Sequence, residues 1–220
     1  MAEYNVAEKF VSINGEGRLA GRPAVFIRFK GCNLRCSYCD TMWANEKSLV
    51  CEKMTEDEIY SYIKSTGISC VTLTGGEPLL QKDIEVLLEK LGRDNFLKIE
   101  IETNGSISIK PFISFKNRPS FTLDYKCPSS GMEEHMLEEN YSLIDERDTI
   151  KFVCGSPEDL ERAKTIIERF KPPCPIYLSP VFGKTEPAEI VDFIIKNKLN
   201  NVNLQLQLHK FIWNPDKRGV

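Results

Sequence analysis

Short apolar segments alternate with helical segments through most of this chain, and this alternation restricts the folds open to it. Runs rich in branched and aromatic residues predict strands at 24–29, 70–73, 98–103, 121–125, 149–154, 176–180 and within 201–208. Helical spacing of apolar residues predicts helices at 55–66, 84–91 and 156–170, and from about 187. The chain is therefore built from strand-helix units.

Repeated strand-helix units favour a mainly parallel sheet with helices packed outside it, as a barrel, a partial barrel or an open sheet. A full eightfold barrel usually needs about 250 residues, and this chain of 220 residues offers only about six units. We therefore expect an α/β fold, an incomplete (β/α)6 barrel, formed as a single domain by residues 1–220.

Helix boundaries are marked by capping signals. Thr55 followed by Glu58 predicts a capping box, and Ser156 followed by Pro157 predicts a second helix start. The helix from Pro187 has an apolar side predicted to comprise Ile190, Val191, Ile194 and Ile195.

Composition excludes several classes of function. The net charge is -3 and the basic residues are dispersed, which argues against a nucleic-acid partner. The N-terminal segment lacks the pattern of a secretory leader, and the sequence has no run of eighteen apolar residues, so we expect no membrane association and a cytoplasmic location. In that reducing compartment, the eight cysteines are expected to be free thiols or metal ligands.

Three of these cysteines, Cys32, Cys36 and Cys39, lie in the loop 31–41 that follows the first predicted strand. Three thiolates can hold a 4Fe-4S cluster and leave one iron open to a small molecule with an amine and a carboxylate. A closed zinc site is the alternative, but it needs a fourth ligand, and His135 and His209 are both distant in sequence. No role is assigned to the other cysteines, which are Cys51, Cys70, Cys127, Cys154 and Cys174.

Polar loops follow the predicted strands, and parallel topology brings them to the same end of the sheet as the cysteine loop. They are TGGEP (74–78), ETNG (102–105), DYKCPSSG (124–131) and SPVFG (179–183). We expect the functional site at this rim.

The cysteine spacing, with Tyr38 before the last cysteine, resembles the signature of the radical S-adenosylmethionine enzymes, and the loop from Gly75 to Pro78 resembles their second motif. The resemblance implies that S-adenosylmethionine binds the open iron, and that glycine backbone approaches its amino group. The implied cofactor contacts are Tyr38, Cys39, Asp40, Gly76, Glu77, Asp124, Tyr125, Lys126, Ser179 and Pro180.

A narrower resemblance extends from residue 13 to the C-terminal residues. INGEG (13–17), FIRFKGCNLRC (26–36), CDT (39–41), DYKCPSSG (124–131) and QLHK (207–210) resemble the 7-carboxy-7-deazaguanine synthase family. This implies a magnesium-dependent ring contraction of 6-carboxy-5,6,7,8-tetrahydropterin with loss of ammonia, on the path to queuosine and other deazapurines. A 5′-deoxyadenosyl radical would start it by taking hydrogen from C6.

The narrower resemblance also implies residue roles. Arg28 would pair with the substrate carboxylate, which a planar guanidinium binds well, and the hydroxyl of Thr41 would help to hold magnesium. The other implied substrate contacts are Ile13, Asn14, Gly15, Glu16, Thr74 and His209.

The family further suggests a flavodoxin-like reductant and a homodimer. Two alternatives stay open at this point. An activase that makes a glycyl radical on a partner protein would share the cysteine spacing, and an iron-sulfur electron carrier would need a fourth cluster ligand.

Overall fold

The computed structural model describes residues 2–220, whose strands form one nine-stranded sheet in the order β3-β1-β2-β4-β5-β6-β7-β8-β9. From β2 to β9 all neighbours are parallel, whereas β1 is antiparallel to both β2 and β3. The strands are β1 (Glu3–Ile13), β2 (Pro23–Phe29), β3 (Glu52–Thr55), β4 (Cys70–Gly75), β5 (Lys98–Thr103), β6 (Ser120–Tyr125), β7 (Thr149–Cys154), β8 (Ile176–Pro180) and β9 (Val202–Leu204).

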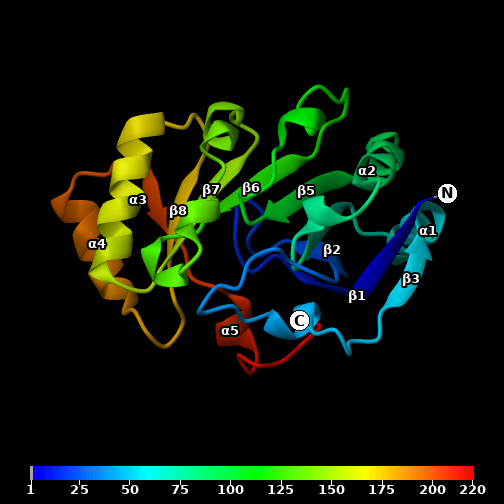
Figure 1. Cartoon of the computed structure of the whole chain (residues 1–220), viewed down its shortest axis with the longest axis horizontal. Coiled ribbons are helices and arrows are strands. Elements are labelled where there is room, and N and C mark those ends of the chain that lie inside the picture. Colours follow the sequence, from blue (N-terminus) through cyan, green and yellow to red (C-terminus); the bar gives the residue numbers. More distant parts are fainter. Residues whose placement is uncertain (1) are drawn as a thin grey trace.

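Four helices in the described part of the chain lie along the outside of this curved sheet, and the short α5 (His209–Ile212) lies beside the loop after β2 (Figure 1). The four are α1 (Glu56–Thr66), α2 (Ile84–Gly92), α3 (Pro157–Phe170) and α4 (Pro187–Lys196). Because β3 and β9 stand at opposite ends of the strand order, the barrel is incomplete, as the sequence predicts. The α5 segment and the C-terminal residues approach the loop after β2, where Lys210 pairs with Asp40.

The predicted capping signals are confirmed. The Thr55 hydroxyl accepts from the Glu58 backbone N-H at 3.2 Å, and the Glu58 carboxylate accepts from the Thr55 N-H at 2.8 Å. At the other end of α1, Gly67 has a φ of 69°, which glycine adopts without steric cost. Ser156 caps α3 by accepting from the backbone N-H of Asp159.

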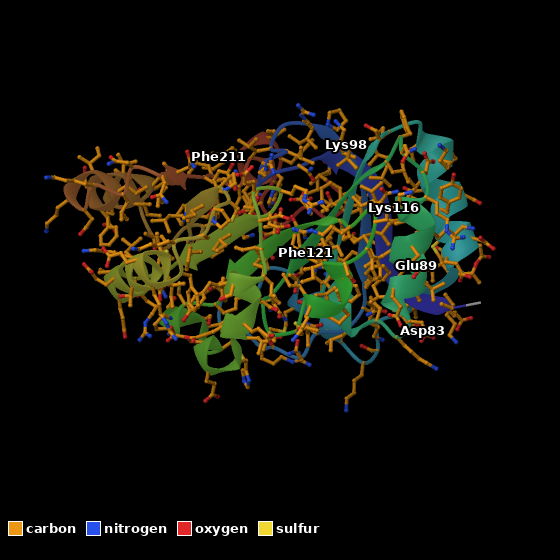
Figure 2. All side chains as sticks on the ribbon, turned by 90° about the horizontal axis from the view of Figure 1, so that it is seen from above. Asp83, Glu89, Lys98, Lys116, Phe121 and Phe211 are labelled. Carbon is orange, nitrogen blue, oxygen red and sulfur yellow. The ribbon has the colours of Figure 1, made fainter. Side chains whose placement is uncertain are left out.

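The parallel strands carry apolar and polar residues alternately, and the two kinds face opposite sides of the sheet. On the side covered by helices, Leu73, Ile101, Leu123 and Phe152 are fully buried in one core cluster. Figure 2 shows Phe121, from the same core layer, in the middle of the molecule, while Phe211 of α5 lies at its surface. The polar residues line the concave side.

Three details differ from the sequence predictions. Strands β1 and β3 were not predicted, and they add an antiparallel edge. Two crossovers, from β5 to β6 and from β6 to β7, contain short 3-10 turns and so depart from the regular strand-helix units of the expected (β/α)6 barrel. In α4, Ile190 is buried, but Ile195 is 69% exposed and so does not belong to the side that packs on the sheet.

Candidate active site on the concave face

A cavity of about 560 Å³ opens on the concave face at the carboxyl ends of the parallel strands. Its walls come from the loops after β2, β4 and β5, from concave-face residues of the middle strands, and from α5 with the residues that follow it. This is the end at which parallel α/β folds place their ligands.

Cys32, Cys36 and Cys39 all line this cavity, and all three are free thiols. Burial raises the pKa of Cys32 and of Cys36, and Lys126 partly offsets the effect at Cys36. These two thiols need a nearby cation to become thiolates, and iron provides one. The three cysteines together fit a 4Fe-4S cluster with three protein ligands.

The cysteine loop is anchored by backbone contacts. The N-H of Cys39 donates to the carbonyl of Cys36 at 3.2 Å, which makes a tight turn within the triplet. Ser37 donates through its backbone N-H to the Ser130 carbonyl at 3.0 Å and through its hydroxyl to the Ser129 carbonyl at 2.7 Å. The loop is thereby held against the turn that follows β6.

The two glycines after β4 lie directly against the backbone of the β2 end. A Cβ on Gly75 would come within 2.3 Å of the Phe29 carbonyl oxygen, and one on Gly76 would come within 2.1 Å of the Gly31 carbonyl oxygen. The Gly76 N-H donates to the Phe29 carbonyl, and the Glu77 N-H donates to the Gly31 carbonyl. These glycines are required for the packing of two loops, whatever ligand they also approach.

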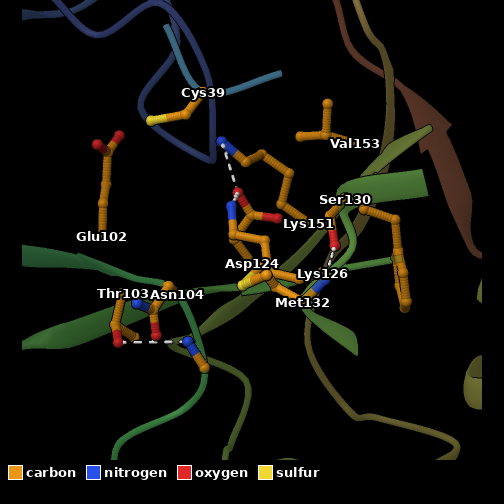
Figure 3. A network of polar contacts seen from close by, with 12 residues as sticks. Cys39, Glu102, Thr103, Asn104, Asp124, Lys126, Ser130, Met132, Lys151 and Val153 are labelled. Carbon is orange, nitrogen blue, oxygen red and sulfur yellow. Dashed lines mark hydrogen bonds and ion pairs between the residues drawn. The ribbon is translucent and has the colours of Figure 1, made fainter. Parts of the chain in front are cut away.

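Charged side chains form a connected series across the concave face (Figure 3). Lys151 on β7 lies 3.2 Å from Glu16 and 3.7 Å from Asp124 on β6. Asp124 in turn accepts from Lys126 at 2.7 Å. Burial acts to lower the pKa of both lysines, but the neighbouring carboxylates outweigh it and raise the pKa of Lys151 and Lys126. Both ammonium groups therefore stay charged.

Further polar pairs occupy the edges of the cavity. Arg28 donates to Glu8 at 2.7 Å, and Lys210 lies 3.2 Å from Asp40. On the floor, Thr74 donates to Glu102 at 2.7 Å. Thr41 lines the cavity beside the triplet, with its hydroxyl 3.7 Å from the Cys39 sulfur.

The β1 end and the segment that contains α5 meet in the cavity although they are far apart in sequence. The Leu208 N-H donates to the Gly15 carbonyl at 3.1 Å, and a Cβ on Gly15 would come within 2.4 Å of His209 Nδ1. Burial lowers the pKa of His209, which favours the neutral imidazole. Ile13, Gly15, Glu16 and His209 are thus brought together.

Five predicted site residues lie outside the cavity lining. Asn14 is buried and accepts from Thr72, while the Tyr125 hydroxyl donates to Glu133. Ser179 and Pro180 are buried at the end of β8. The Glu77 carboxylate is buried against the end of β5, so its side chain does not reach the cofactor space from this position.

Several lining residues were not predicted from the sequence. They include Glu102 and Lys151, which are charged residues that alternate with apolar residues inside strands, and that placement is a signal the sequence does carry. Asn104 lies in the polar loop after β5, which the sequence placed at the rim of the sheet without a role for this residue. Trp43 and Arg218, which stack with the guanidinium carbon 4.1 Å from the ring centre, carry no comparable signal.

Comparisons with known proteins identify the family to which this chain belongs. Residues 26–124 match the Radical SAM superfamily. A 7-carboxy-7-deazaguanine synthase of Clostridium acetobutylicum is 58% identical over 219 residues, with 99% of each chain covered. The chain belongs to the 7-carboxy-7-deazaguanine synthase family.

Other members of the 7-carboxy-7-deazaguanine synthase family are more distant. The protein of that name from Chlorobaculum tepidum is 40% identical, with 100% of this chain and 98% of the relative covered. The Bacillus subtilis protein of that name is 31% identical, with 95% of each covered. QueE from Escherichia coli has the same fold, with a TM-score of 0.71 at 23% identity, covering 93% of this chain and 94% of that one.

Family membership establishes the cofactors as a 4Fe-4S cluster and S-adenosylmethionine, with Mg²⁺ consistent with the family. The donor set of Cys32, Cys36 and Cys39 fits the cluster. No helix within residues 2–220 has the length and apolar character needed to span a membrane.

Proposed function

We propose that this chain is a lyase that converts 6-carboxy-5,6,7,8-tetrahydropterin to 7-carboxy-7-deazaguanine with loss of ammonia. The observation that carries the proposal is the near full-length identity of 58% to a relative of that name. The cavity supports it, because three cysteines, an arginine and a set of carboxylates line one space large enough for a cofactor and a bicyclic substrate.

The cluster and S-adenosylmethionine, when bound, supply the one-electron chemistry that starts the ring contraction. The protein's part is to bind, orient and exclude water. Cys32, Cys36 and Cys39 would hold the cluster. Asp124 and Lys126 would contact the cofactor from the end of β6, where their mutual ion pair fixes both side chains.

Substrate binding is proposed at the β1 and β2 side of the cavity. Arg28 would bind the substrate carboxylate, and Glu16 would accept from the pterin N-H groups. One oxygen of Glu16 is paired with Lys151, and the other is buried without a partner among the described residues, which leaves it open to a donor from the ligand. Gly15 and His209 would border the same ring.

Thr41 is proposed to contribute one ligand to a magnesium ion. A hard cation needs several oxygens, so the substrate carboxylate and water would complete its coordination. We also propose a homodimer and a flavodoxin-like reductant, which rest on the family resemblance alone, and a cytoplasmic location, which rests on the sequence composition.

The test is a single anaerobic assay. Reconstituted protein is supplied with dithionite, S-adenosylmethionine, Mg²⁺ and the carboxylated tetrahydropterin, and 7-carboxy-7-deazaguanine is measured by chromatography and mass spectrometry. Cys36→Ala should abolish product, whereas Cys51→Ala, which alters a cysteine outside the cavity lining, should not. An intact cluster with no product would contradict the proposed reaction.

A further inference from the structure

The sulfur of Cys32 accepts hydrogen bonds from two N-H groups. One is the backbone N-H of Leu34, at 3.4 Å, and the other is the side-chain amide of Asn104, also at 3.4 Å. A thiolate sulfur bound to iron keeps lone pairs that accept such donors, and hydrogen bonds to the sulfurs are one of the means by which a protein sets the potential of its cluster. Asn104 comes from the loop after β5, far from the cysteine loop in sequence.

The orientation of the Asn104 amide follows from its partners. Its Oδ1 accepts from the Ser106 backbone N-H at 2.9 Å and from the Ser106 hydroxyl at 2.6 Å. Its Nδ2 donates to Asn33 Oδ1 at 3.1 Å and to the Cys32 sulfur. In the reversed orientation, NH₂ would face the Ser106 N-H and the oxygen would face Asn33 Oδ1, so two favourable contacts would become repulsive.

The hydrogen bonds of the Asn104 side chain belong to a closed ring. Asn33 Nδ2 donates to the Ser106 hydroxyl at 2.8 Å, so the side chains of Asn33, Asn104 and Ser106 form a ring of hydrogen bonds. Both amide hydrogens of Asn104 are then used, one within the ring and one on the sulfur. Asn104 is 7% exposed, so water does not compete freely for the sulfur contact.

Glu77 holds the backbone of Asn104 from the buried side. Its carboxylate accepts from the Asn104 N-H at 2.7 Å, from the Thr103 hydroxyl at 2.9 Å and from the Leu79 N-H at 3.0 Å. Figure 3 shows Thr103 and Asn104 side by side at the end of β5. Glu77 thus links the glycine loop after β4 to the residue that reaches Cys32.

We propose that Asn104 is a tuning residue for the iron-sulfur cluster: its Nδ2-H donates to the Cys32 sulfur and makes the cluster easier to reduce, while Glu77 and Ser106 position it. The added electron increases negative charge on the sulfurs, so the hydrogen bond is stronger in the reduced state than in the oxidised state. The inference needs the cluster of the proposed function, but it needs neither its substrate nor its reaction.

The test is an EPR-monitored redox titration of reconstituted protein without S-adenosylmethionine or pterin. In Asn104→Leu, which has a similar volume and no donor, we expect the one-electron reduction constant to fall about tenfold, a shift of about 59 mV to more negative potential. Asn203→Leu is the matched control, because it removes an amide donor to the Ile176 carbonyl at 3.3 Å, outside the cavity lining, and should leave the potential unchanged.

A second variant and a second measurement guard against loss of the cluster in Asn104→Leu. Asn104→Asp keeps the size and the acceptor toward Ser106 but loses both amide hydrogens. Its added negative charge lowers the potential by itself, so this variant is read by the deuteron coupling measured next. Electron-nuclear double resonance of the reduced cluster in deuterated water should lose one exchangeable-deuteron coupling in either variant. A wild-type potential in a variant with wild-type iron and sulfide content would overturn the inference.

Failure of this inference is distinct from failure of the proposed function. If the potential shifts as expected but wild-type protein makes no 7-carboxy-7-deazaguanine, the tuning role stands and the proposed reaction is wrong. If product forms and the potential is insensitive to residue 104, the reaction stands and the tuning role is wrong.

Discussion

Lys151 and Phe152 are neighbours on β7 but belong to opposite faces of the sheet. Lys151 lies in a polar cavity between Glu16 and Asp124, whereas Phe152 is fully buried beneath the outer helices and contacts Tyr125 with ring centres 5.5 Å apart. The comparison shows that the same strands form both the hydrophobic core and the wall of the cavity. The apolar face supplies the free energy of folding through burial, and the polar face holds charges whose arrangement is useful only when a ligand is bound.

Of the variants that separate the two faces of the sheet, Lys151→Met should weaken ligand binding most. Without the ammonium group, Glu16 loses its paired cation while Asp124 keeps Lys126. Removal of one partner from a buried ion pair costs about 3–5 kcal/mol of folding free energy. We expect S-adenosylmethionine or substrate binding to weaken at least about tenfold, the equivalent of 1.4 kcal/mol.

Calorimetric binding of S-adenosylmethionine to the reconstituted protein measures the first loss, and KM for the pterin measures the second. Lys151→Arg is the control, because it keeps the charge and should recover part of the binding. If Lys151→Met binds both ligands as wild type does, the charged series across the concave face has no role in binding.

Phe152→Ala tests the other face. It removes a fully buried ring from the core and should cost about 3–5 kcal/mol of unfolding free energy. Urea denaturation measures this loss, and Phe152→Leu should recover most of it. The folded fraction should keep wild-type KM values, because the side chain does not line the cavity. Altered KM with unchanged stability would reverse the assignment of the two faces.

Glu100 provides a smaller, pH-dependent test of the concave face. Burial, with a further contribution from Glu102, raises the pKa of Glu100 from 4.5 to about 7. Between these two values the folded chain keeps a proton that the unfolded chain has lost. The free energy of unfolding therefore falls as the pH rises from 4.5 through 7. The total change is roughly 3 kcal/mol, at 1.36 kcal/mol for each pKa unit.

Glu100→Gln isolates this effect, because the amide oxygen can still accept from the Thr122 hydroxyl, as the carboxyl does at 2.6 Å. Urea denaturation at pH 5 and pH 8 should show wild type losing stability relative to Glu100→Gln over this range. A difference between the two proteins that stays constant with pH would show that Glu100 is ionised throughout.

The parallel part of the fold could be predicted from the sequence because its signals are local. Branched and aromatic runs mark the strands, and Thr55 and Ser156 mark helix starts that the structure confirms. Strand β1 was missed although Tyr4 and Val6 are buried and alternate with exposed Glu3 and Asn5. A bulge between Val6 and Glu8 then interrupts that alternation, which weakens the pattern.

The site was predictable where motifs are contiguous. The cysteine loop, Arg28, Thr41 and Gly76 all line the cavity as expected. Contacts that depend on tertiary packing were not predictable in this way. The sequence gives no reason why Asn104 should reach Cys32, or why the Glu77 carboxylate should turn toward β5, because both depend on how the ends of β4 and β5 lie together.

Gly75 and Gly76 leave no clearance between the glycine loop and the cysteine loop. Ordinary contact of a Cβ begins near 3.4 Å, so a methyl group at residue 76, which would lie 2.1 Å from the Gly31 oxygen, would force the loops apart by more than an ångström. The spacing of the two loops is therefore a fixed length set by main-chain atoms. Side-chain substitutions elsewhere in the cavity can change its charge and shape, but they do not alter the main-chain contacts that set the distance between the two loops.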